Sequence, residues 1–123
     1  MRVADSSFIV EGLLKRKELL EEDLLTLELA LYETANSIWK HQIILKDFRD
    51  GMPYLNVLLE LIQSGRIRVV RPGSELMKKA YSMAFQHNRS IYDTVFVALA
   101  SELGLKLATF DRRQAELMRW THS

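Results

Sequence analysis

Apolar positions along the chain change their spacing several times, and each change predicts a new element. Apolar residues three and four positions apart are typical of helices at 8–14, 28–46, 54–63, 74–87 and 91–103. Short leucine-rich or β-branched runs at 1–4, 67–71 and 105–109 predict strands. The run at 24–27 fits a strand or the lead-in to the next helix. This alternation predicts a parallel sheet covered by helices.

Turn and capping residues mark the ends of these segments. A helix is expected to start in Asp5-Ser6-Ser7, and the last helix is expected to start at Asp111. Turn chemistry recurs at 50–53, 64–65, 72–73 and 104. The dense charge run at 15–23 predicts a solvated helix end followed by a loop.

The segment 91–103 has almost no polar face, which predicts a helix sandwiched inside the molecule. In open α/β sheets, function gathers beyond the carboxyl ends of the strands. The residues that follow the predicted strands are therefore the first place to look for chemistry.

Composition narrows the class. The chain has 123 residues, of which 48% are apolar and 27% charged, so one folded domain over 1–123 is expected. The absence of cysteine excludes disulfides, thiolate zinc sites and a cysteine nucleophile. Residues 1–62 carry 7 basic and 11 acidic residues, whereas residues 63–123 carry 10 and 5. Uncharged apolar stretches such as 94–101 are far too short to span a bilayer, and a cytoplasmic location is expected.

Four carboxylates lie at positions that suggest a functional site. Asp5 follows the first strand, Asp111 follows the last, and Asp93 lies in the first turn of the buried helix. Each of these three also fits an ordinary role at a helix start. Glu33 lies inside a helix among apolar neighbours, with no cation three or four positions away. A half-buried carboxylate must find a partner or change its protonation state.

If these carboxylates converge, their mutual repulsion raises their pKa values unless a cation is present. Mg²⁺ or Mn²⁺ prefers such oxygen ligands, polarises a phosphoryl oxygen and lowers the pKa of bound water. The chemistry that this predicts is phosphodiester hydrolysis. Ser7 and Thr109 would add hydroxyl groups at the same rim.

Three segments carry a family resemblance: VADSSFIV, LALYETANSIWK and IYDTVFVALASELGLKLATFD. They occur in family order and span essentially the whole chain, and the third is the most specific. The sequence resembles PIN-domain ribonucleases of the VapC type, the toxins of VapBC toxin–antitoxin pairs.

The resemblance implies a three-layer α/β/α fold about a short parallel sheet. About four strands are expected, because no obvious fifth strand follows Asp111. The resemblance further implies a metal-dependent endoribonuclease that is inhibited by a VapB-type antitoxin and forms a homodimer. The implied site residues are the metal-binding acids Asp5, Glu33, Asp93 and Asp111, and the supporting polar residues Ser7, Asn36 and Thr109.

Basic residues beside the expected site suit an RNA substrate. Arg112 and Arg113 directly follow Asp111 and are the candidates for contacts to RNA phosphates. The main alternative is a non-catalytic PIN-like module that binds RNA or protein, which loss of the acidic residues would indicate. A phosphoacceptor receiver domain would need an aspartate at the end of a central strand, and none follows Val69-Val70.

Overall fold

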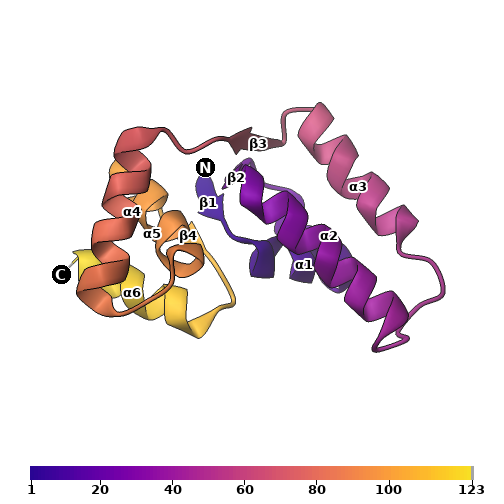
Figure 1. Ribbon diagram of the computed structural model, residues 1–123. Helices are drawn as coiled ribbons and strands as arrows, with labels where there is room; N and C mark the ends of the chain where they lie inside the picture. Colours follow the sequence, from indigo (N-terminus) through magenta and orange to yellow (C-terminus); the bar gives the residue numbers. More distant parts are fainter. Residues whose placement is uncertain (123) are drawn as a thin grey trace.

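Four short parallel strands form the central sheet of the computed structural model, which describes residues 1–122 and the side chains through Arg119 (Figure 1). Residue 123, the end of the predicted domain, lies outside the described residues. The sheet order is β3-β2-β1-β4. The strands are β1 (Arg2–Ala4), β2 (Leu24–Leu27), β3 (Ile67–Val70) and β4 (Leu107–Ala108).

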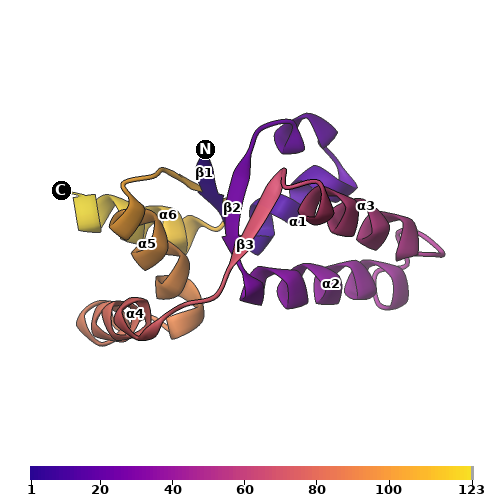
Figure 2. The ribbon, with the colours of Figure 1, turned by 90° about the horizontal axis from the view of Figure 1, so that it is seen from above.

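Helices cover both faces of this sheet, so the predicted three-layer α/β/α fold is confirmed (Figure 2). One face carries α1 (Ser6–Leu14), α2 (Glu28–Ile43) and α3 (Met52–Gln63), together with the short 3₁₀ helix η1 (Lys17–Leu20). The other face carries α4 (Ser74–His87), α5 (Ile91–Leu103) and α6 (Arg112–His122). Among the described residues, no helix is long and apolar enough to cross a membrane.

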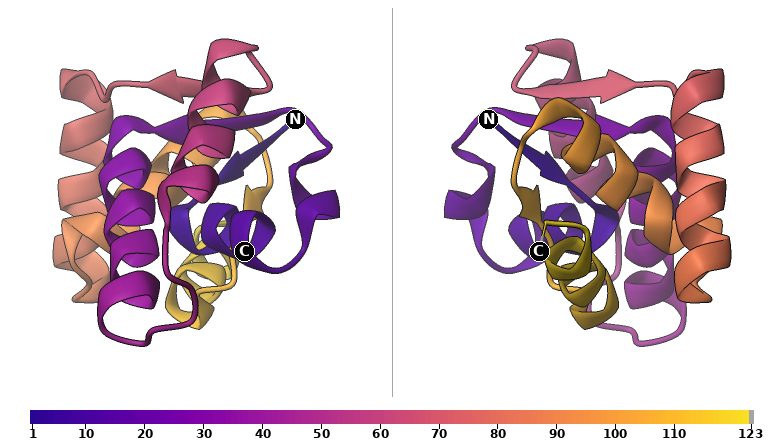
Figure 3. Two further views of the ribbon diagram at one scale, coloured as in Figure 1. Left: turned by 90° about the vertical axis from the view of Figure 1, so that its right-hand side faces the viewer. Right: turned by 90° about the vertical axis from the view of Figure 1, so that its left-hand side faces the viewer.

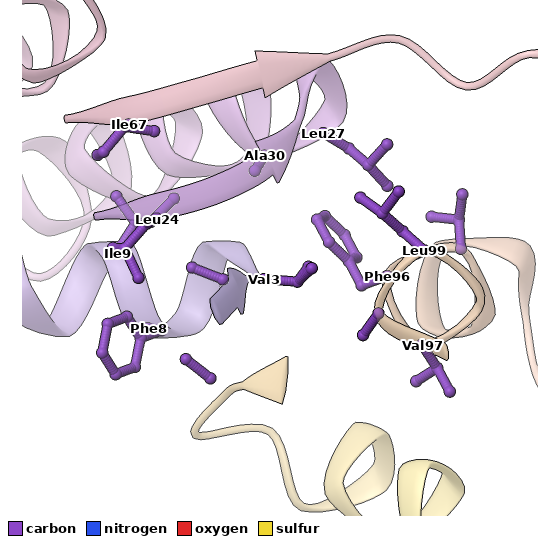
Figure 4. Close-up of a cluster of buried hydrophobic side chains, with 14 of the residues drawn as sticks. Val3, Phe8, Ile9, Leu24, Leu27, Ala30, Ile67, Phe96, Val97 and Leu99 are labelled. Atoms are coloured by element: carbon purple, nitrogen blue, oxygen red, sulfur yellow. The ribbon is translucent and has the colours of Figure 1, made fainter. Parts of the chain in front are cut away.

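The helix α5 packs against the sheet and is buried without interruption from Thr94 to Ala100. Figure 3 shows α5 crossing the sheet between α4 and α6. Its Phe96 and Leu99 side chains point towards β1 and β2 (Figure 4). The Thr94 hydroxyl donates to the Ala80 carbonyl at 2.8 Å and so joins α5 to α4. The sandwiched helix that the apolar run predicts is confirmed.

The chain order of the strands places a topological switch between β1 and β4. The chain passes from β1 to β2 and β3 in one direction, and β4 then returns to the far side of β1. Ala4 pairs with Ala108 in the β1–β4 register, so Asp5 and Thr109 leave the sheet side by side. Crevices of open α/β sheets lie at such switch points.

The structure corrects several predicted boundaries. The second helix ends at Ile43 instead of near Lys46, because the backbone at Lys46 turns into the left-handed region with φ 55°. The last strand is only two residues long. The run at 24–27 is a strand, bonded to both β1 and β3. The charge run at 15–23 contains the 3₁₀ turn η1, where a loop was expected.

Candidate active site

Asp5 occupies the switch point as the N-cap of α1, with an exposed fraction of 1%. Its carboxylate accepts hydrogen bonds from the Ser7 hydroxyl at 2.7 Å, from the Phe8 amide at 3.0 Å and from the Thr109 hydroxyl. Burial raises the pKa of Asp5 and the charge of Asp111 adds to the rise, while the three hydrogen bonds oppose it. The capping role and the site role therefore coexist in one side chain.

The segment after β4 is bonded into the same network. The Thr109 hydroxyl accepts from the Asp111 amide at 2.9 Å, and the Ser7 hydroxyl accepts from the Phe110 amide at 2.9 Å. Asp111 caps the start of α6 by accepting from the Arg113 amide at 2.8 Å. Two segments about a hundred residues apart in sequence are thereby locked together at the carboxyl ends of β1 and β4.

Glu33 approaches the same region from the second turn of α2. Burial raises the pKa of this carboxyl, a hydrogen bond from Ser6 lowers it, and the charges of Asp5 and Asp93 raise it. The partner that Glu33 lacks within its own helix is thus a hydroxyl from the start of α1. Ser6 was not among the predicted site residues, because the resemblance assigns a supporting hydroxyl only to Ser7 of Asp5-Ser6-Ser7.

Asp93 lies in the first turn of α5, where its amide donates to the N-capping Ser90 hydroxyl at 3.3 Å. Its side chain is half-buried and interacts electrostatically with Glu33. A carboxylate near a helix N-terminus is stabilised by the helix dipole. The four acids therefore come from four different elements, and their charges act on one another in pairs.

The remaining predicted residues lie at the rim. Asn36 is exposed one turn after Glu33, and within the described residues no hydrogen bond joins it to the acids. Arg112 and Arg113 are exposed at the start of α6, directly beside Asp111. The structure thus brings Ser7 and Thr109 into the acid network and leaves Asn36 and the two arginines around it.

The donor chemistry of these acids fits a hard divalent cation, because every side chain offers oxygen ligands. Burial raises the pKa values of Asp5 and Glu33, and the neighbouring carboxylates add a smaller rise, so a cation would relieve both effects. Among the described residues, no three acidic or histidine side chains lie close enough together to form a ready-made ion cage. Mg²⁺ does not need such a cage, since it is usually bound by one or two carboxylates, waters and substrate phosphates.

The parallel sheet covered by helices places this chain in the α/β class of proteins. Its acidic site lies at the carboxyl ends of the strands, where the sheet order reverses. The family model of the PIN domain matches residues 3–119. Ribonuclease VapC3 of Pyrobaculum aerophilum is 38% identical over 97 residues, which cover 77% of this chain and 71% of that protein. The chain therefore belongs to the PIN-domain family and is of the VapC type, as the sequence predicted.

Two solved structures share the fold. PAE2754 from Pyrobaculum aerophilum matches 96% of this chain and 84% of its own with a TM-score of 0.76 and 19% identity. VapC20 of Mycobacterium tuberculosis, described as a toxin that cleaves the sarcin–ricin loop, matches 94% of both chains with a TM-score of 0.71 and 17% identity. At these identities, the two structures support the fold alone.

Proposed function

We propose that this protein is a metal-dependent endoribonuclease that hydrolyses RNA phosphodiester bonds. The observation that carries the proposal is the convergence of buried and half-buried carboxylates at the β1–β4 switch point, with raised pKa values at Asp5 and Glu33. The kinship with Ribonuclease VapC3 supports RNA as the substrate.

In this proposal Asp5, Glu33, Asp93 and Asp111 hold Mg²⁺ or Mn²⁺. When bound there, such an ion would supply Lewis-acid chemistry for a phosphoryl oxygen and a water of lowered pKa. Ser7 and Thr109 hold the Asp5 carboxylate in place and favour its ionised form through the hydrogen bonds that they donate to it.

The rim residues have supporting roles in the same proposal. Arg112 and Arg113 bind phosphates of the RNA strand beside Asp111, because guanidinium groups match phosphate oxygens in charge and geometry. Asn36 offers a polar side chain to the substrate from the exposed face of α2.

A substrate panel tests this proposal. Labelled single-stranded RNA, structured RNA and single-stranded DNA of the same sequence are incubated with the protein and Mg²⁺, with the Glu33→Gln variant as the inactive control. The proposal is supported if the unaltered chain cleaves RNA and the Glu33→Gln variant does not. Failure of the protein to cut any RNA with Mg²⁺ or Mn²⁺, while it still binds RNA, would instead support the non-catalytic PIN-like module.

We further propose that a VapB-type antitoxin restrains the protein in the cytoplasm. This proposal is supported by the fact that the chain is of the VapC type. The product of a small neighbouring reading frame, purified with this chain, is expected to co-elute with it and to suppress RNA cleavage. If that product leaves cleavage unchanged at a molar excess, it is not the antitoxin.

A homodimer is the expected state of the free protein. Large apolar side chains that a second copy would cover are exposed on α4, where the exposed fractions of Tyr81 and Phe85 are 65% and 85%. Exposed apolar patches of this kind mark protein interfaces. Analytical ultracentrifugation is expected to give a dimer for the unaltered chain and a monomer for Phe85→Glu. A monomer in both cases would exclude this interface.

A further inference from the structure

Four side chains stack in a column beside the acid site, which we call the arginine–phenylalanine column. The Arg2 guanidinium lies 5.1 Å from the centre of the Phe8 ring, and the Phe8 and Phe110 rings are stacked at 5.7 Å with an interplanar angle of 11°. The Arg16 guanidinium then lies 5.1 Å from the centre of the Phe110 ring. Both contacts have the geometry of cation–π interactions.

Both rings of this column are fixed to the acid site through their backbones. The Phe8 amide donates to the Asp5 carboxylate, and the Phe110 amide donates to the Ser7 hydroxyl, which itself donates to Asp5. Phe110 also lies directly between Thr109 and Asp111 in the chain. The position of the column relative to the carboxylates is therefore set by the same hydrogen bonds that set the site.

The two ends of the column differ. At the inner end Phe8 is buried, and the Arg2 guanidinium is paired with Glu22. At the outer end 52% of the Arg16 side chain is exposed. In the described part of the chain, its one hydrogen bond runs from Nε to the Glu11 carboxylate at 3.3 Å. The terminal nitrogens of Arg16 are thus the available donors of the column, and Glu11 and Phe110 hold them in place.

The surroundings of Arg16 are basic. Lys15 and Lys17 flank it in sequence and are exposed, and the Phe110 contact brings Arg16 close to the start of α6, where Arg112 and Arg113 are exposed. A strand of RNA that reaches the negatively charged acid site needs such cations for its flanking phosphates. The cations come from both halves of the chain.

We propose that Arg16, positioned by Phe110 and Glu11, binds a backbone phosphate of the RNA outside the cleaved bond. Arg16 and the arginines of α6 then form a track for single-stranded RNA that leads away from Asp111. The inference rests on the proposed ribonuclease function and adds to it a binding residue, Arg16, from the turn between α1 and η1, and a positioning residue, Phe110. Because the contact is to the backbone, it is independent of base sequence.

Binding of a short labelled single-stranded RNA, measured by fluorescence anisotropy with Mg²⁺, tests the proposal. All compared proteins carry Asp93→Asn, so that the RNA stays intact. Arg16→Gln is expected to weaken binding roughly three- to tenfold at low salt. The slope of log affinity against log salt is expected to become shallower by about 0.7, the value for one phosphate contact on a single strand. Arg16→Lys retains the charge and most of the slope.

Matched controls separate binding from positioning. Arg68→Gln removes an exposed arginine from β3, at the opposite edge of the sheet, and is expected to leave affinity and slope unchanged. Phe110→Leu is expected to weaken binding when Arg16 is present and to have no added effect in Arg16→Gln, whereas Phe110→Tyr keeps the ring and the affinity. An equal loss for Phe110→Leu in both backgrounds would overturn the positioning role.

The failure of this inference is distinguishable from failure of the proposed function. If the chain with Asp93 intact cuts RNA but Arg16→Gln binds RNA with unchanged affinity and slope, the track is wrong and the ribonuclease stands. If the intact chain neither binds nor cuts RNA, both fall together.

Discussion

The Thr109 hydroxyl donates a hydrogen bond to the Asp5 carboxylate across 104 positions of sequence. The same oxygen accepts from the Asp111 amide at 2.9 Å. One hydroxyl therefore connects two acids that follow neighbouring strands, and it fixes their relative position where the sheet reverses its order. The relative position of Asp5 and Asp111 therefore depends on this threonine.

Replacement of Thr109 by valine is expected to remove this connection with little change of shape. Loss of the donor to a buried carboxylate is expected to lower the free energy of unfolding by about 1–2 kcal/mol. It also raises the pKa of Asp5 further, because the bond from Thr109 lowers that pKa. The acid limb of the cleavage rate against pH therefore moves to higher pH.

Denaturant unfolding and a pH–rate profile measure both effects. Thr109→Ser keeps the hydroxyl and serves as the matched control, with a smaller loss of stability and an unmoved acid limb. A profile that shifts equally in the serine and valine variants would contradict the role of the hydroxyl.

Glu33→Gln is expected to stabilise the chain in metal-free buffer at pH 8. The folded-state pKa of Glu33 is raised above its ordinary value of 4.5, so its ionisation destabilises the fold. Its contribution to stability is fully present below pH 4.5 and is lost as the pH rises through the raised pKa. The melting temperature of Glu33→Gln is expected to exceed that of the unaltered chain by about 2–5 °C at pH 8.

The difference should shrink towards pH 4, where both side chains are neutral. Glu102→Gln, an exposed acid on α5, is the control and should not alter the melting temperature. A Glu33→Gln variant that is less stable than the unaltered chain at pH 8 would show that the charge of Glu33 is paired in the fold.

Mn²⁺ is expected to raise the melting temperature of the unaltered chain. At a hundredfold excess over its dissociation constant, a ligand that binds only the folded state stabilises it by about 2.7 kcal/mol. Asp93→Asn removes one of the proposed ligands and is expected to abolish most of the shift, whereas Glu102→Gln on the same helix keeps it. Equal shifts in all three proteins would place bound Mn²⁺ away from Asp93.

Gly12 is required by the packing of α1 against η1. A Cβ atom at this position would lie 2.5 Å from the Cγ atom of Leu20, which is itself buried. Gly12→Ala is therefore expected to destabilise the fold by about 1–3 kcal/mol through overpacking.

Leu20→Ala removes the obstructing atoms, and together with Gly12→Ala it completes a double-mutant cycle. The double variant is expected to be less destabilised than the sum of the two single variants, because each change makes room for the other. Strict additivity in denaturant unfolding would mean that Gly12 and Leu20 do not compete for the same space.

The order of the elements was predictable because apolar spacing reports burial, and the strongest pattern belongs to the most buried helix, α5. Prediction was weakest where apolar residues are exposed. Ile43, Ile44 and Leu45 extended the helical pattern of α2, yet all three are exposed and the helix ends at the first of them. Spacing alone cannot tell an apolar residue in the core from one on the surface.

Asp5, Asp93 and Asp111 were predictable as residues that follow strands or begin helices, and Glu33 as a carboxylate inside a helix among apolar neighbours. Ser7 and Thr109 were also predicted, but Ser6 and Phe110 were not, because the hydrogen bond of Ser6 to Glu33 and the stack of Phe110 on Phe8 depend on how α1, α2 and the end of β4 pack together. The same holds for Arg16, which comes from a charge run with no sequence feature that connects it to α6. Such contacts form only across elements distant in sequence.

The most direct test of the central claim is cleavage of one labelled RNA by the unaltered chain and by Asp5→Asn, each with Mg²⁺ and with EDTA. Asparagine retains the capping acceptor at this position, so the variant is expected to fold. The account predicts cleavage by the unaltered chain with Mg²⁺ only. Cleavage that persists both in EDTA and in Asp5→Asn would contradict it.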